Sequence, residues 1–97
     1  MWYNKAIMNT KQFNYRIIVE KEKEDNGKDV YIAYAPSLGI SDFGQTVEQA
    51  VLNMEIAIKL YVETLYELKQ PVPEQDTNDY FVTTRKIEVN TALPHAT

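Results

Sequence analysis

Hydrophobic and polar positions alternate along two stretches in the first half of the chain, residues 15–22 and 29–35. A period of two with many β-branched side chains is typical of β-strands. The apolar side chains of each stretch divide between two faces: Ile17 and Val19 against Ile18, then Val30, Ile32 and Tyr34 against Tyr31, Ala33 and Ala35. Between the stretches, Asn26-Gly27 predicts a hairpin with a type I′ turn, because both residues tolerate positive φ. Residues 40–43 can add a short third strand.

A long amphipathic helix is predicted to begin at Thr46. The sequence Thr46-Val47-Glu48-Gln49 has the form of a capping box, in which the Thr and Gln side chains satisfy two free backbone donors. Pro71 predicts the end of the helix, because the residue before a proline avoids the helical conformation, and at ~1.5 Å per residue the helix would run about 33 Å. Apolar residues recur along it at the spacing of a core-facing stripe: Val47, Ala50, Val51, Met54, Ala57, Ile58, Tyr61, Leu65 and Leu68.

A final strand is predicted over residues 80–89, with Phe81, Ile87 and Val89 on one side and Tyr80 and Val82 on the other. The element order is then β-β-β-α-β, and the expected fold class is α+β, an antiparallel sheet with one long helix packed on one face. Four strands about 4.8 Å apart are wider than one helix about 10 Å in diameter. We therefore expect part of the sheet to stay uncovered, with Ile18, Tyr31, Tyr80 and Val82 exposed in a monomer. A homodimer or higher homo-oligomer is the expected consequence.

The length and net charge of the chain limit its number of domains and the kinds of partner it can bind. The 97 residues suit one domain, which we place at residues 15–90 between an N-terminal arm, 1–14, and a flexible tail, 91–97. The net charge of −4 opposes direct DNA or RNA binding, which depends on neutralising phosphates, and favours a basic protein partner. There is no cysteine and no apolar run of roughly 20 residues that could span a bilayer, so we expect a cytoplasmic protein without membrane attachment.

Candidate catalytic groups are few, and we expect no enzyme activity, no cofactor and no metal. A two-metal nuclease site would need converging carboxylates, and the candidates Glu20, Glu48, Glu55 and Glu88 are spread along the chain. Glu48 more simply stabilises the N-terminus of the helix, and Glu55 can pair with Lys59 one helical turn later. His95, the only histidine, lies two residues from the C-terminus and has no second histidine to work with.

Residues 31–73 carry a resemblance to a known family. The segments YIAYAPSLG, GQT, EQAVLNMEIAI and PVPE follow one another with the order and spacing of the HicB-like antitoxin family, of the UPF0150 type, and with the flanking strands the resemblance covers about three quarters of the chain. The matched positions are Tyr31, Ala33, Pro36, Leu38, Gly39, Gly44, Thr46, Glu48, Ala50, Asn53, Ala57, Ile58, Pro71 and Pro73. The resemblance implies a reduced ribonuclease H-like fold without catalytic carboxylates.

The same resemblance implies an antitoxin that covers the active site of a HicA-type toxin, a small basic protein that cleaves mRNA with a histidine. Expected partner-binding residues are Ile18, Tyr31, Asp42, Phe43, Tyr80 and Val82. Two departures from the family pattern affect this picture: the loop 37–43 is short and lacks the common Pro-Gly-Cys, and residues 85–94 resemble the opening of a DNA-binding ribbon without the helices that would follow. The alternative is an orphan module of the same fold that binds itself or a different protein.

Overall fold

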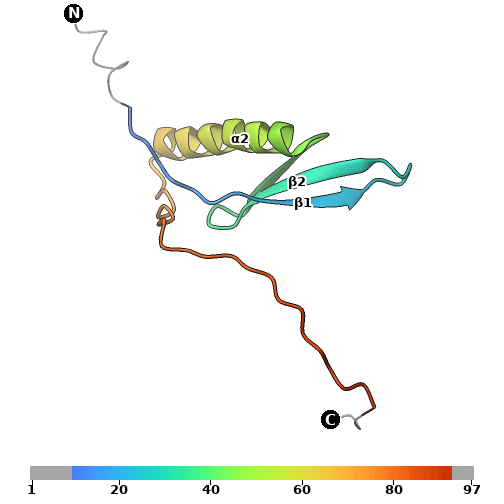
Figure 1. The fold of residues 1–97 in the computed structure, drawn as a ribbon. Helices are drawn as coiled ribbons and strands as arrows, with labels where there is room; N and C mark the ends of the chain where they lie inside the picture. The colour runs from blue at the N-terminus through green and yellow to red at the C-terminus, as the bar shows by residue number, and fades with distance from the viewer. Residues whose placement is uncertain (1–9, 93–97) are drawn as a thin grey trace, which may run out of the picture.

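The computed structural model describes residues 10–92 and consists of one antiparallel sheet with one helix packed on it (Figure 1). The strands are β1 (Ile18–Lys23), β2 (Asp29–Ala35) and β3 (Ile40–Gly44), in the spatial order β1-β2-β3, and the helix α2 spans Val47–Glu67. This confirms the α+β class and the meander followed by a helix. No helix in residues 10–92 is long and apolar enough to cross a membrane.

The β1–β2 hairpin forms where it was expected, but its turn is of a different type. Glu24 and Lys28 close the loop through a Glu24 N to Lys28 O bond of 2.8 Å, and Gly27 N donates to Glu24 O at 2.9 Å. Gly27 has φ +84°, whereas Asn26 is not among the residues with positive φ. A type I′ turn needs positive φ at both central residues, so that prediction is wrong. The loop is instead a type I turn followed by a left-handed glycine, which adds a bulge.

Helix α2 begins at Thr46 as the sequence predicts. The Gln49 backbone N–H donates to the Thr46 hydroxyl at 3.0 Å, which satisfies one free donor of the first turn. The Gln49 side-chain oxygen accepts from the backbone N–H of Gln45 at 2.6 Å, one residue before the cap, so the reciprocal bond of a capping box is displaced. At the other end, Lys69 has φ 56°, and its N–H donates to Tyr66 O at 3.1 Å, which ends the helix ahead of Pro71.

The core lies between the sheet and α2 and is built largely from small side chains. Its fully or nearly enclosed members are Ala33, Ala35, Leu38, Ala50 and Met54. The small residues let the two layers approach closely. At Gly44, where β3 leads into the helix, an added Cβ would stand only 2.5 Å from the backbone N of Ala50. The helical stripe is therefore confirmed in its middle, while Val47 and Leu68 at its ends are exposed.

The final strand expected over residues 80–89 is not part of this sheet. The segment is extended but has no ladder partner in the described residues, and Figure 1 shows it leaving the body of the domain. Its side chains are open to solvent, from 51% for Tyr80 to 94% for Phe81. Alternation in the sequence identified a segment with the pattern of a strand, but pairing requires an adjacent backbone, which residues 10–92 do not supply.

Candidate protein-interaction surface

One face of the sheet is left uncovered by the described helix and strands. The strand register places directly paired side chains on the same side, and α2 packs against the side that holds Val19, Ala33 and Ala35. The opposite side, which we call the open sheet face, consists of Ile18, Glu20, Glu22, Val30, Ile32, Tyr34, Ser41 and Phe43. Its apolar side chains include three that are well exposed, Ile18 at 36%, Tyr34 at 44% and Phe43 at 60%. Neighbouring exposed apolar side chains of this kind mark interfaces.

The open sheet face is acidic as well as apolar. Glu20 is opposite Ile32 and Glu22 is opposite Val30 in the register, and both carboxylates lie on the edge strand β1. Glu20 and Glu22 are the ionised side chains that the three strands place on this face. The apolar part of the face is therefore bordered by negative charge along β1. Arg16, just before β1, is engaged by Asp76 at 3.5 Å. Such a surface is complementary to a partner with an apolar centre and a basic rim.

The six expected partner-binding residues divide among three places. Ile18 and Phe43 lie on the open sheet face. Tyr31 and Asp42 lie on the side that faces α2: Tyr31 is half-buried against the core, which corrects its expected exposure, and Asp42 accepts a 2.8 Å bond from the N–H of Phe43. Tyr80 and Val82 are exposed, as expected, on residues 70–92, which follow α2 and which we call the C-terminal segment. Sequence alternation separated the two faces but did not say which one the helix would cover.

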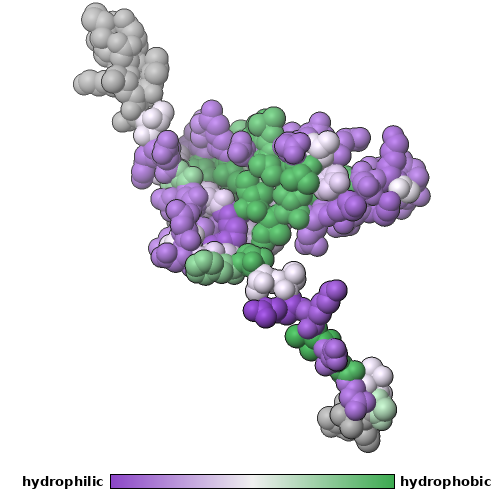
Figure 2. All heavy atoms as spheres, in the orientation of Figure 1, coloured by the Kyte–Doolittle hydropathy of each residue, from purple (hydrophilic) through white to green (hydrophobic). Residues whose placement is uncertain are grey.

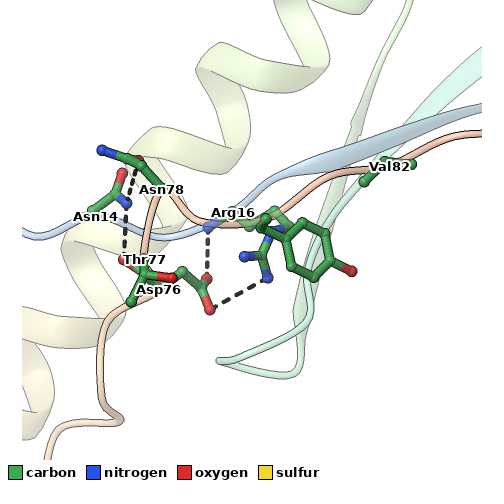
Figure 3. Close-up of a pocket in the computed structure, with 7 residues that line it drawn as sticks. Asn14, Arg16, Asp76, Thr77, Asn78 and Val82 are labelled. Atoms are coloured by element: carbon green, nitrogen blue, oxygen red, sulfur yellow. Dashed lines mark hydrogen bonds and ion pairs between the residues drawn. The ribbon is translucent and has the colours of Figure 1, made fainter.

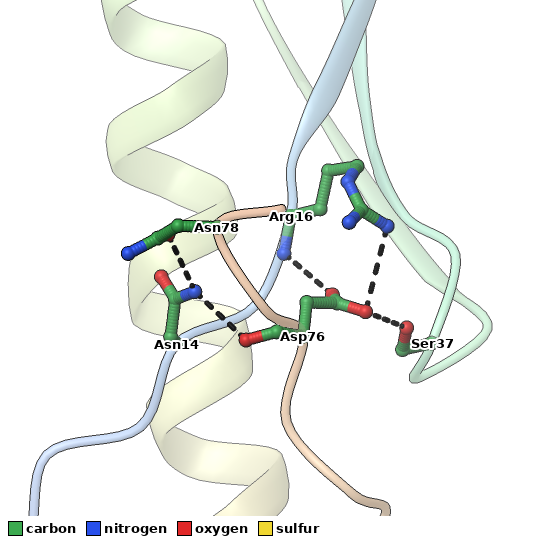
Figure 4. Close-up of polar contacts among 5 residues, drawn as sticks. All are labelled: Asn14, Arg16, Ser37, Asp76 and Asn78. Atoms are coloured by element: carbon green, nitrogen blue, oxygen red, sulfur yellow. Dashed lines mark hydrogen bonds and ion pairs between the residues drawn. The ribbon is translucent and has the colours of Figure 1, made fainter. Parts of the chain in front are cut away.

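The C-terminal segment is attached to the start of β1 by Asp76 (Figure 4). The Asp76 carboxylate accepts hydrogen bonds from the backbone N–H of Arg16 at 2.7 Å and from the Ser37 hydroxyl at 2.6 Å. The backbone N–H of Asp76 donates to the carbonyl oxygen of Asn14 at 2.8 Å. The bond from the Arg16 N–H lowers the pKa of the Asp76 carboxyl most of all, and the bond from Ser37 and the charge of Arg16 lower it further. The cluster joins positions about 60 apart in sequence, and no local signal in the sequence reveals it.

A small pocket of about 300 Å³ lies beside this attachment, lined by Asn14, Arg16, Asp76, Thr77, Asn78, Tyr80 and Val82 (Figure 3). The Arg16 guanidinium stacks 3.3 Å from the centre of the Tyr80 ring. Close by, the Tyr15 hydroxyl donates to Pro73 O at 2.6 Å, and burial, with the charge of Asp76, raises the pKa of Tyr15. The polar groups around this pocket form hydrogen bonds with one another, and these bonds hold residues 73–78 against residues 14–16.

A second apolar surface was missed by the sequence reasoning. Leu52, Ile56 and Leu60 follow one another at four-residue intervals along α2 and are 56%, 60% and 66% exposed. The spacing was visible in the sequence, but the core-facing stripe of the same helix accounted for its amphipathic pattern. Figure 2 shows hydrophobic residues gathered over α2 on one face of the molecule and continuing below it toward the strands.

Groups suited to metal chemistry do not gather in the described residues. No three His, Asp or Glu side chains in residues 10–92 come close enough to hold an ion. Glu20 lies on the open sheet face, Glu48 in the first turn of α2 and Glu55 beside a groove between α2 and residues 10–17, while Glu88 is on the C-terminal segment. His95, part of the tail and part of the arm lie outside the described residues.

Comparison with known proteins gives one informative relative. The chain is 43% identical over 65 residues to the UPF0150 protein ssr1765 of Synechocystis sp., an alignment that spans 66% of this chain and 77% of the relative. No protein-family model and no solved structure matches the chain. At this identity and coverage, the chain belongs to the UPF0150 family.

Proposed function

We propose that this protein is a HicB-like antitoxin, which binds a HicA-type mRNA-cleaving toxin and neutralises it sterically without catalysis of its own. The observation that carries the proposal is the open sheet face, apolar at Ile18, Tyr34 and Phe43 and acidic at Glu20 and Glu22. Membership of the UPF0150 family and the resemblance of residues 31–73 to the HicB pattern support the same assignment.

The chemistry of the face suits the class of partner. A toxin that binds RNA must present basic side chains around its active site, because phosphate neutralisation supplies most of that affinity. The carboxylates of Glu20 and Glu22 would meet this basic rim, while the exposed ring of Phe43 would be an anchor in the desolvated centre. A protein seated there excludes RNA by occupying the same surface, so neutralisation requires no reaction.

Co-expression tests this function directly. The probe is any small basic protein with a single histidine that a gene adjacent to that of this chain encodes, expressed with and without the chain, and growth is the readout. The wild-type chain should relieve the growth arrest, and Phe43→Lys, which places a positive charge among the apolar side chains of the open sheet face, should abolish relief. The matched control is Leu52→Lys, because Leu52 is 56% exposed against 60% for Phe43 but lies on the side of α2 away from the core.

Purified proteins distinguish a binding defect from misfolding. Circular dichroism should show the same helix content for Phe43→Lys and Leu52→Lys, because both positions are exposed. A pull-down with a toxin whose active-site histidine is replaced should retain the wild type and Leu52→Lys and lose Phe43→Lys. Equal retention of both variants would reject the open sheet face as the toxin site, and arrest that the wild-type chain cannot relieve would reject the antitoxin function.

An orphan module that binds copies of itself or a different protein is the second candidate. The observation that favours it is the exposed extended segment 80–89, which offers a chain for pairing whether or not a toxin exists. Absence of a basic neighbour with one histidine in the genome, together with a stable homo-oligomer, would favour this candidate over the antitoxin.

A further inference from the structure

Residues 80–89 have the properties of a strand but no partner in the described part of the chain. Phe81, Val82, Ile87 and Val89 are between 72% and 94% exposed, although such side chains are strongly favoured in sheets. Phe81, Ile87 and Val89 are separated by even numbers of residues and so fall on one face of an extended chain. An exposed apolar segment of this kind can pair with the free edge of a sheet.

The sheet has a matching free edge at β1. In the order β1-β2-β3, β1 is an edge strand, and no backbone hydrogen bond joins its outer side to another described segment. The other edge strand, β3, is held by the helix: α2 lies over it, and the Asn53 side chain donates to the carbonyl of Phe43 at 2.8 Å. The sheet edge that can take an added strand is therefore that of β1.

The C-terminal segment is directed past the start of β1. The backbone N–H of Asp76 donates to the carbonyl oxygen of Asn14, and the Asn14 side-chain amide donates to the Asn78 side-chain oxygen at 3.2 Å. Two residues further along each segment, Arg16 stacks on Tyr80. The two segments therefore run side by side in the same direction up to the first residues of β1. The rest of the segment then continues away from its own sheet (Figure 1).

We propose that the segment 80–89 of one chain adds a strand to the outer edge of β1 in a second copy, which returns its own segment in exchange. Within residues 10–92, each chain has one unpaired extended segment and one free sheet edge, so a twofold arrangement pairs both in each copy and closes the assembly. The charges agree with such pairing, because Arg85 lies on the same face of the segment as Phe81, Ile87 and Val89 and would point to the side of the sheet where α2 carries Glu55, Glu63 and Glu67. This inference is independent of the proposed antitoxin function.

The apolar side chains of the incoming strand also have a place to go. A groove of about 1180 Å³ lies between α2 and the segment that leads into β1, with Tyr15, Ile17, Ile58, Val62 and Tyr66 among its lining residues. On this side of the sheet α2 contacts β3 and β2 more extensively than β1. The face of the partner segment that holds Phe81, Ile87 and Val89 would enter the open end of this groove beside β1.

Sedimentation velocity on the full chain gives the first test. The expected mass is twice the 11.3 kDa of one chain. Ile87→Asp, at a position 76% exposed in the single chain, should weaken dimerisation at least about tenfold without loss of helix content, because it puts a charge into the paired strand. Leu52→Asp, at a 56% exposed position on α2, is the matched control and should leave the dimer intact. A monomeric wild type, or equal effects of the two variants, would overturn the proposal.

Cysteine cross-linking separates exchange between chains from closure within one chain. The chain has no cysteine, so single sites can be introduced without background. A tagged Lys21→Cys chain and an untagged Thr83→Cys chain are co-expressed and treated with a short bismaleimide. Exchange predicts a cross-linked pair of unequal chains, well above the yield from Glu48→Cys with Thr83→Cys. Cross-links found only within a chain that carries both Lys21→Cys and Thr83→Cys, or a yield equal to the control, would overturn exchange.

Discussion

Met54 offers the sharpest test of how the domain is held together. Its side chain is fully enclosed, and it clusters with Ala33, Ala35 and Ala50, all 0% exposed. Met54→Ala would remove the methionine side chain beyond Cβ and leave a cavity. The enclosed alanine neighbours cannot fill this cavity, because they have no side-chain rotamers. Large-to-small changes of this kind cost about 2–5 kcal/mol, and poor relaxation favours the upper part of the range, about 3–5 kcal/mol. For a domain of this size, that lowers Tm by more than about 12 °C.

Thermal unfolding followed by circular dichroism measures this cost, with two controls. Met54→Leu keeps the volume close to that of methionine and should cost under about 1.5 kcal/mol. Leu52→Ala removes a side chain of similar size from a position that is 56% exposed, and should cost well under half as much as Met54→Ala. Equal losses of Tm for Met54→Ala and Leu52→Ala would refute the reasoning, because the penalty would then not depend on enclosure.

Three further changes test separate contacts. Gly44→Ala should destabilise the fold by about 1–3 kcal/mol in chemical denaturation, since its Cβ would stand 2.5 Å from the backbone N of Ala50, whereas a neutral result would show that the strand and helix can separate freely. Thr46→Ala should cost about 1 kcal/mol by removing the cap of α2, and Thr46→Ser should restore most of it. The lowered pKa of Asp76 means that its carboxylate stabilises the fold above the unfolded pKa of about 3.9 and loses that effect as pH falls through the folded pKa. The difference in Tm between wild type and Asp76→Asn should therefore be present at pH 7 and shrink below about pH 4, and a difference that does not change with pH would contradict this account.

The local pattern of the sequence was enough to predict the first three strands, the helix and its start. Alternation in residues 29–35 separated Val30, Ile32 and Tyr34 from Tyr31, Ala33 and Ala35, and the structure keeps this division. Thr46 was identifiable because an N-cap depends on the residue itself and on its neighbours within one turn. These features share a physical basis, since each is decided by interactions between residues close together in the chain.

What could not be predicted depends on contacts between distant residues or on small differences in energy. The choice of face for α2 placed Tyr31 and Asp42 toward the helix, and alternation is silent on that choice. The Asp76 cluster joins the two ends of the domain and has no sequence motif. The turn at Gly27 differs from the expected type because Asn26 does not adopt positive φ. Of the six expected partner-binding residues, Ile18 and Phe43 lie on the open sheet face, whereas Tyr34 of the same face was not named, because alternation does not say which face the helix covers.

The two proposed surfaces both use β1 but use different groups of it. Toxin binding would involve the side chains of Ile18, Glu20 and Glu22, which project from the open sheet face, whereas strand exchange uses backbone N–H and C=O groups in the plane of the sheet. Pairing at the edge therefore leaves the open sheet face free, and the added strand widens it. A dimer that formed by packing two open sheet faces together would instead bury Phe43 and compete with the toxin. Addition of toxin to the dimer distinguishes these arrangements, because an edge-paired dimer stays intact and a face-paired dimer separates.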